Sequence, residues 1–167
     1  MNISDQGSGA GNQSSGASNQ SSGAKRVAEE LSRNAIPVPT PETQHFWDGT
    51  AAGELRLQKC TVCAHVFFPP RPFCPSCSSR WVEVFAASGW GTLYSYTINH
   101  VQPRHLPQAP QSMALVQLDE GPRMISTIVD VEQTPAALVL DMKLRVAFRK
   151  LSETIWLPVF KPDTGSS

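Results

Sequence analysis

The four cysteines of this 167-residue chain lie in one short stretch and are spaced like metal ligands. They form two Cys-x-x-Cys pairs, separated by ten residues that include Pro-Pro-Arg-Pro. Each tight pair directs two thiolates toward one point, and the short connection lets the two pairs face each other. We therefore predict one Zn²⁺ bound by Cys60, Cys63, Cys74 and Cys77. Because four cysteines leave a tetrahedral metal no open position, this zinc is predicted to be structural.

Three other uses of the cysteines compete with the zinc site. Two disulfides would suit a secreted mini-protein, but a reducing cytosol disfavours them. A redox Cys-x-x-Cys needs only one pair, at the start of a helix, whereas both pairs here lie in proline-rich loop sequence. Iron in a rubredoxin-like site stays open as the less favoured metal, because four thiolates suit either ion.

Composition restricts the class of protein. Charged residues make up 17% of the chain and the formal net charge is zero, so it lacks the basic surplus of a non-specific nucleic-acid binder. No stretch approaches the roughly 20 consecutive apolar residues that a membrane helix requires. The first residues lack the charged-then-apolar pattern of a signal peptide, so we expect a cytoplasmic protein.

The N-terminal part of the chain is predicted to be a disordered, low-complexity tail over residues 1–35. Its first 24 residues are mostly Gly, Ser, Asn, Gln and Ala, and the hexamer Asn-Gln-Ser-Ser-Gly-Ala occurs twice. Such a segment cannot bury enough apolar surface to offset the entropy of ordering it. Whether residues 1–24 are native or an added linker stays open. Residues 163–167 are likewise expected to be disordered.

A helical segment is predicted next, over residues 36–53. Thr40-Pro41-Glu42 has the pattern of an N-cap, a proline at the first helical position and an acid in the first turn. The helix should run from about 41 to 50, carrying the aromatic pair Phe46 and Trp47. Two roles for this pair are weighed equally, namely packing on the zinc module and contact with a partner protein.

Short strands around the cysteine pairs predict a zinc ribbon over residues 54–87. We expect these strands at Glu54–Lys59, Val66–Phe68 and Trp81–Phe85. A unit of this size lacks the core to fold well without its metal.

Longer strands predict a second β domain over residues 88–162. They are expected at Gly89–Ile98, Met113–Leu118, Arg123–Val129, Lys143–Phe148 and Thr154–Phe160. The stretch Thr134–Leu140 fits a helical turn or a strand, and His100–Gln111 is expected to be a loop. Five strands in this arrangement fit a small Greek-key barrel of the OB type. The predicted fold is thus mainly β, with an N-terminal helix, a rubredoxin-like zinc ribbon and a five-stranded OB-fold barrel.

Three groups of residues resemble motifs of a known family. They are Pro69-Pro70-Arg71 with Cys74-Pro75 in the ribbon; Ser88-Gly89, Gly91, Tyr94-Ser95 and Thr97 at the start of the barrel; and Val116 with Leu118-Asp119-Glu120-Gly121-Pro122-Arg123 in the central hairpin. Together with a ribbon-then-barrel order, they make residues 36–162 similar to the acyl-CoA-associated zinc-ribbon plus OB-fold family, called domain of unknown function thirty-five.

The resemblance implies a non-catalytic or co-catalytic subunit that helps to hold or channel acyl-CoA. Its expected partners are thiolases and thiolase-like synthases, steroid side-chain aldolases, or MaoC-like enoyl-CoA hydratases. The chain departs from the family at three positions where glycine is usual or frequent, which are Ala64, Ser78 and Asp141. If Ala64 adopts the left-handed conformation of a metal knuckle, the cost is on the order of 1 kcal/mol.

The sequence contains no complete catalytic apparatus that we recognise. The histidines are scattered, and Gly-rich phosphate loops, His-Glu metal motifs and serine elbows are absent from it. Candidates for contacts with CoA phosphates are Arg71, Arg104 and Arg123, because arginine matches phosphate oxygens bidentately. Two rival functions are a single-stranded nucleic-acid binder that uses Trp90, Tyr94 and Tyr96, and a rubredoxin-like electron carrier.

Overall fold

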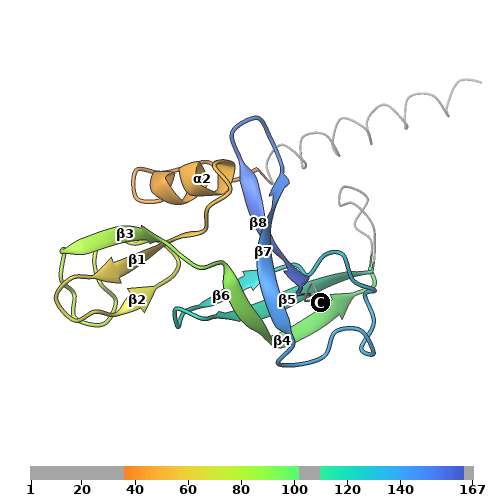
Figure 1. The fold of residues 1–167 in the computed structure, drawn as a ribbon. Coiled ribbons are helices and arrows are strands. Elements are labelled where there is room, and N and C mark those ends of the chain that lie inside the picture. Colours follow the sequence, from red (N-terminus) through yellow and green to blue (C-terminus); the bar gives the residue numbers. More distant parts are fainter. Residues whose placement is uncertain (1–35, 102–109, 164–167) are drawn as a thin grey trace, which may run out of the picture.

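The computed structural model describes residues 36–101 and 110–163, which form one helix, a small three-stranded sheet and a larger five-stranded sheet (Figure 1). The elements are α2 (Gln44–Ala51), β1 (Arg56–Cys60), β2 (Val66–Phe67), β3 (Val82–Ala86), β4 (Trp90–Asn99), β5 (Gln111–Leu118), β6 (Arg123–Ser126), β7 (Lys143–Lys150) and β8 (Trp156–Pro162). The expected tails, apart from residue 163, and most of the expected loop between β4 and β5 lie outside the described residues.

The mainly β fold predicted from the sequence is confirmed. The small sheet has the order β2-β1-β3 and the large one the order β6-β5-β4-β7-β8, with every neighbouring pair antiparallel. A parallel bridge between Ile128 and Phe160 then joins the two ends of the large sheet. This closure gives the partly open barrel of an OB-type fold.

Alternating burial is clearest in β5 of the barrel. Every second residue of β5 is buried, and these residues face the buried side chains of neighbouring strands. Thr134–Leu140, which the sequence left ambiguous, forms a helical turn in which Leu138 donates a backbone hydrogen bond to Thr134.

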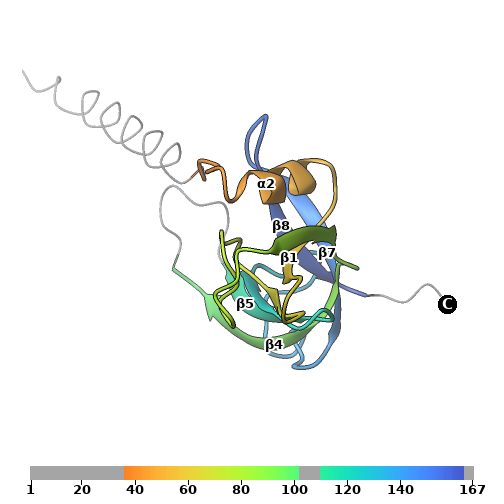
Figure 2. The same cartoon turned by 90° about the vertical axis from the view of Figure 1, so that its left-hand side faces the viewer.

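The barrel is open along a seam between β6 and β8. Beyond the bridge at Ile128, the two strands are linked by the Ser126 hydroxyl, which donates a hydrogen bond to the carbonyl of Pro158 at 2.8 Å. Figures 1 and 2 place α2 beside β8, on the side where the ribbon joins the barrel. The helix therefore packs against both modules.

The helix starts later than its sequence predicts. Residues 41–43 form a turn in which Thr43 and Gln44 both donate backbone hydrogen bonds to the carbonyl of Thr40, and α2 begins only after it. Thr40 therefore closes a turn and does not cap the helix. The helix also continues past Gly49, and Gly53, with a φ of 79°, ends it.

The connection between ribbon and barrel is held from both sides. The Ala87 N–H donates to the carbonyl of Leu55 in the ribbon, at 2.7 Å. The Ser88 N–H donates to Oε1 of Glu120, in the turn between β5 and β6, at 2.6 Å. Gly89 follows with a φ of 78°, and its carbonyl accepts from Val146 of β7 at 2.8 Å. These bonds fix the ribbon relative to the barrel.

Candidate functional site

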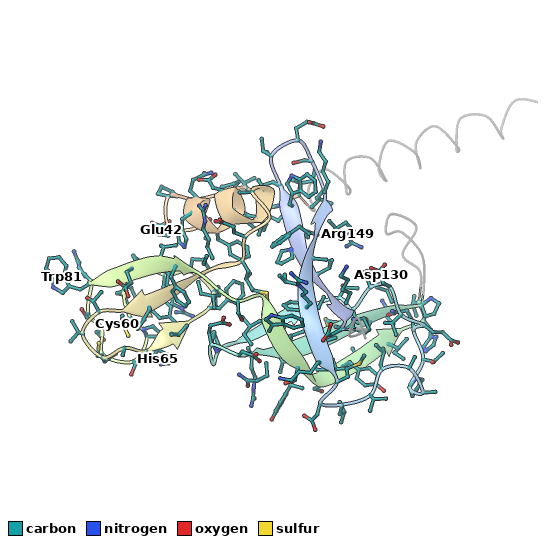
Figure 3. All side chains as sticks on the ribbon, in the orientation of Figure 1. Glu42, Cys60, His65, Trp81, Asp130 and Arg149 are labelled. Atoms are coloured by element: carbon teal, nitrogen blue, oxygen red, sulfur yellow. The ribbon has the colours of Figure 1, made fainter. Side chains whose placement is uncertain are left out.

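The four cysteines meet at the end of the ribbon that lies away from the barrel. Figure 3 shows Cys60 there, with Trp81 nearby. The sulfur atoms all lie within 4.8 Å of one another, and the Cys60–Cys77 and Cys63–Cys74 Sγ distances are both 3.6 Å. A tetrahedral zinc with bonds of about 2.3 Å requires sulfur separations of roughly 3.8 Å. The donor set therefore fits a four-coordinate thiolate metal, as predicted, and iron fits it equally well.

The two cysteine turns have the same backbone construction. Ala64 donates a hydrogen bond to the carbonyl of Cys60, and Ser78 donates one to the carbonyl of Cys74, both at 2.9 Å. Ala64 and Ser78 have φ values of 60° and 59°. Both thus adopt the left-handed conformation that glycine usually occupies, which for Ala64 is the conformation considered in the sequence analysis.

The thiol environment favours a bound cation. The pKa of Cys60 is lowered to about 6, and the main cause is the backbone N–H of Cys63. Burial raises this pKa. The Val62 N–H and the thiols of Cys77 and Cys63 lower it further. At Cys77 the Ser79 N–H lowers the pKa, but the Cys63 thiol, burial and the other two thiols together raise it to about 12. Four thiolates this close cannot all ionise unless a cation balances their charge.

Two of the three predicted phosphate-binding arginines line one cavity between ribbon and barrel. This cavity, of about 520 Å³, is called the arginine cavity below. Arg71 reaches it from the ribbon and Arg123 from the start of β6. Arg104 lies outside the described residues. The cavity is also lined by Ala64, His65, Val66, Phe67, Phe68, Pro75, Glu120, Gly121 and Pro122.

A second, mostly apolar cavity follows the open seam of the barrel. This apolar groove has a volume of about 360 Å³ and is walled by α2, the segment after β2, β6, β7 and β8. Its lining includes Phe46, Trp47, Phe68, Pro69, Pro70, Met124, Ile125, Leu157, Pro158 and Val159, with Thr43, Ser126, Thr127 and Arg149 at polar positions. Arg149 belongs to β7, and Figure 3 labels it on the β7–β8 hairpin.

The aromatic pair of α2 divides into two roles. Phe46 is only 5% exposed and belongs to the core of the chain. Its ring contacts that of Trp47 edge-to-face, with 5.0 Å between the ring centroids, and lies 5.4 Å from the ring centroid of Phe68. Its ring therefore joins the helix to the ribbon loop. Trp47 is half-buried and forms part of the wall of the apolar groove, so the proposed contact with a partner concerns Trp47 above all.

The described histidines do not form a second site. His45 lies in α2, His65 in the ribbon and His100 after β4, whereas His105 is outside the described residues. Burial, followed by the charge of Arg56, lowers the pKa of His45. Within residues 36–101 and 110–163, the four cysteines are the one cluster of three or more potential metal ligands.

Sequence reasoning missed the apolar groove because its walls come from five separate segments of the chain. The one signal available was Ile125, an outward-facing apolar residue of β6 that is 69% exposed.

No helix in the described residues is long and apolar enough to cross a membrane.

Comparison with known proteins identifies both modules. The family model of a ChsH2 rubredoxin-like zinc ribbon domain matches residues 47–83, and that of the ChsH2 C-terminal OB-fold domain matches residues 84–149. A DUF35 domain-containing scaffold protein of Methanothermobacter thermautotrophicus is 37% identical over 101 residues, which cover 59% of this chain and 74% of that protein.

Two further relatives are named as parts of enzymes. A probable enoyl-CoA hydratase alpha subunit of Thermomonospora curvata is 31% identical over 118 residues, 70% of this chain but 36% of that protein. The chain thus spans about a third of the length of that relative. Among solved structures, a chain of the Ltp2-ChsH2(DUF35) aldolase has a TM-score of 0.69 and 28% identity, over 77% of this chain and 100% of that one. By these matches the chain belongs to the DUF35 family of zinc-ribbon and OB-fold proteins.

Proposed function

We propose that this chain is a non-catalytic or co-catalytic accessory subunit of an enzyme that acts on acyl-CoA thioesters. The observation that carries the proposal is the match to the aldolase structure, in which the DUF35 chain is covered completely. The Thermomonospora relative supports the same reading, because its name describes a hydratase of CoA thioesters. In this role the chain binds a catalytic partner and helps to hold the thioester.

The partner is proposed to be a thiolase-like enzyme, an aldolase or a MaoC-like hydratase. Trp47 is the proposed anchor for it, because a tryptophan at the edge of an apolar groove can bury a large area in a complementary pocket. The metal is proposed to be zinc, with a structural role, because four thiolates leave it no open position.

The nucleic-acid alternative is less favoured by the surface of the barrel. The Arg123 guanidinium lies over the Tyr94 ring, 3.5 Å from its centroid, and that of Arg145 lies 5.3 Å from the centroid of Trp90. One face of each ring is therefore already occupied. A stacking platform for bases uses such faces.

The test is co-expression of the full chain with thiolase-like, aldolase and hydratase proteins of its own organism, followed by size-exclusion chromatography with mass measurement. A stable complex with one of them, and acyl-CoA turnover that requires the chain, is the expected result. Binding of a fluorescent single-stranded oligonucleotide, with no complex formed by any of the enzymes, would contradict the proposal. The red colour of an oxidised iron tetrathiolate would support the electron-carrier alternative.

A further inference from the structure

The cations of the β7–β8 hairpin are paired with acids at one end of the hairpin and not at the other. At the loop end, Nζ of Lys150 lies 3.0 Å from the Glu153 carboxylate. At the opposite end, where β7 pairs with β4 (Figure 1), Arg145 of β7 lies directly across from Lys161 of β8. Both residues are exposed, and neither forms a salt bridge in the part of the chain that the structure describes.

The pairing of Arg145 with Lys161 is unfavourable for the chain by itself. Residues directly opposite each other in an antiparallel sheet have Cβ atoms about 4.5–5.5 Å apart, and like charges at such positions destabilise the sheet. An exposed position on the outside of a barrel needs only a polar side chain, so the fold gives no reason for two cations here. Local features that cost stability without a structural return are expected at functional sites.

A half-buried tryptophan completes the row. Trp90 of β4 is the partner of Arg145 on the other side of β7, and the Arg145 guanidinium lies 5.3 Å from the centroid of its ring. This distance is within the range of about 6 Å for a cation–π contact, which orients the guanidinium. Paired residues point to the same side of a sheet, so Trp90, Arg145 and Lys161 form one outward row, called the basic face below.

We propose that the basic face docks a carboxylate side chain, from an Asp or Glu on the surface of the catalytic partner. The inference rests on the proposed function and deepens it by assigning a contact to the partner that is separate from Trp47. Two cations on neighbouring strands can hold one carboxylate between them through charge-assisted hydrogen bonds. The Trp90 ring supplies apolar surface beside that contact, as aromatic residues at interfaces commonly do.

The place of α2 lets one partner reach both contacts. Leu157 and Val159 alternate with Lys161 along the same face of β8, and both line the apolar groove beside α2. The helix that carries Trp47 therefore packs on the hairpin nearer its loop, and the basic face begins where this cover ends. A single partner surface that runs along the hairpin can contact Trp47 and the basic face together.

The neighbours of the basic face favour one carboxylate over a polyanion. Lys143, two residues from Arg145 on β7, has its Nζ 3.9 Å from Oδ1 of Asp119, and the Asp163 N–H donates to the Lys143 carbonyl. Two acids thus lie on one side of the basic face, and α2 covers the hairpin on the other. A nucleic-acid strand needs cations along successive phosphates and would meet these acids, whereas one carboxylate meets only Arg145 and Lys161.

The experiment measures association of the metal-loaded full chain with its partner enzyme by titration calorimetry at several salt concentrations. The double variant Arg145→Glu with Lys161→Glu should weaken association about tenfold or more, because it replaces two attractive contacts by repulsion. The remaining affinity should depend less on salt than that of the wild type. The matched control is Arg80→Glu with Lys150→Glu, which changes the net charge equally at two exposed residues outside the basic face and should leave association nearly unchanged.

Two further readouts separate docking from a structural role. A carbodiimide joins an amine to a carboxylate in contact with it, so mass spectrometry of the treated complex should find Lys161, but not Lys150, linked to an Asp or Glu of the partner. Lys161→Gln should remove this link and weaken association. The same variant should keep or raise the melting temperature, because it removes the repulsion from Arg145. A lowered melting temperature with unchanged association would show that Lys161 is structural.

Three other results would overturn the inference. They are equal losses of association in the charge-reversed and control variants, a complex in which Lys161 forms no link to the partner, and binding of a single-stranded oligonucleotide that charge reversal abolishes while partner association is unchanged. If a partner enzyme still associates and its turnover requires the chain, the assignment of the basic face fails but the proposed function stands. If no partner associates with the wild-type chain, both fail.

Discussion

Replacing Ala64 by glycine should stabilise this protein, although the change only removes a methyl group. Ala64 is exposed and has a φ of 60°, so its backbone is in the left-handed conformation. This conformation costs an L-residue roughly 1–2 kcal/mol, because its Cβ comes close to the following carbonyl oxygen. Glycine relieves that cost in the folded state. It also increases the entropy of the unfolded chain, which removes about 0.4–1 kcal/mol of the gain.

The expected net effect of Ala64→Gly is a rise of about 0.5–1 kcal/mol in the free energy of unfolding. For a chain of this size that corresponds to roughly 1–4 °C in melting temperature. Ser78→Gly should act similarly, since Ser78 is exposed, has a φ of 59° and occupies the equivalent place in the second cysteine turn. Asp141→Gly should gain less, because Asp tolerates its φ of 63° better than Ala does.

The assay is equilibrium denaturation in excess zinc, with the metal competition between protein and a chromophoric chelator as a second readout. Ala52→Gly is the matched control, because Ala52 is also exposed but has a φ of −85°. This control should lose about 0.5–1 kcal/mol. If Ala64→Gly destabilises the protein as much as Ala52→Gly does, the left-handed strain has been misjudged.

Three other changes have definite expected outcomes. Cys74→Ser should abolish stoichiometric metal binding and unfold the ribbon while much of the barrel stays folded. Elemental analysis measures the metal content and hydrogen exchange measures the folding of each part. Metal-free wild-type protein with a folded ribbon would contradict the prediction. Trp47→Ala should weaken association with the partner by about 2 kcal/mol or more, and an unchanged dissociation constant with a lowered melting temperature would exclude the interface role. Gly89→Ala should destabilise the protein by about 2 kcal/mol or more. The new Cβ would lie 2.7 Å from Cγ1 of Val146, and residue 89 has a φ of 78°. In denaturant melts, the double variant with Val146→Ala should recover part of the lost stability.

Local patterns were sufficient to predict the modules of the fold. The cysteine spacing predicted a cluster that the structure assembles, and the strand predicted at Met113–Leu118 lies within β5. The start of α2 was wrong because the hydrogen bonds of Thr40 close a separate turn before the helix. A local pattern contains too little information to distinguish a capped helix from a turn followed by a helix.

Features that depend on contacts between modules could not be read from the sequence. The sequence left Phe46 between packing on the zinc module and contact with a partner, and its ring packs between α2 and Phe68. Arg71 and Arg123 are each predicted from the suitability of arginine for phosphate, and no local pattern indicates that the two line one cavity. Their meeting depends on how the ribbon is placed on the barrel, which the bonds of Ala87 and Ser88 determine.

The position of Arg71 shows how a metal without an open coordination site can still matter for ligand binding. Arg71 lies between the two cysteine pairs, so the loop that carries it is closed at both ends by the metal site. Arg123 lies on the barrel, where hydrogen bonds and core packing hold it without any metal. We therefore expect that one side of the arginine cavity depends on the metal and that the other does not. A structural zinc would contribute to the proposed function by keeping these two guanidinium groups on opposite sides of one cavity.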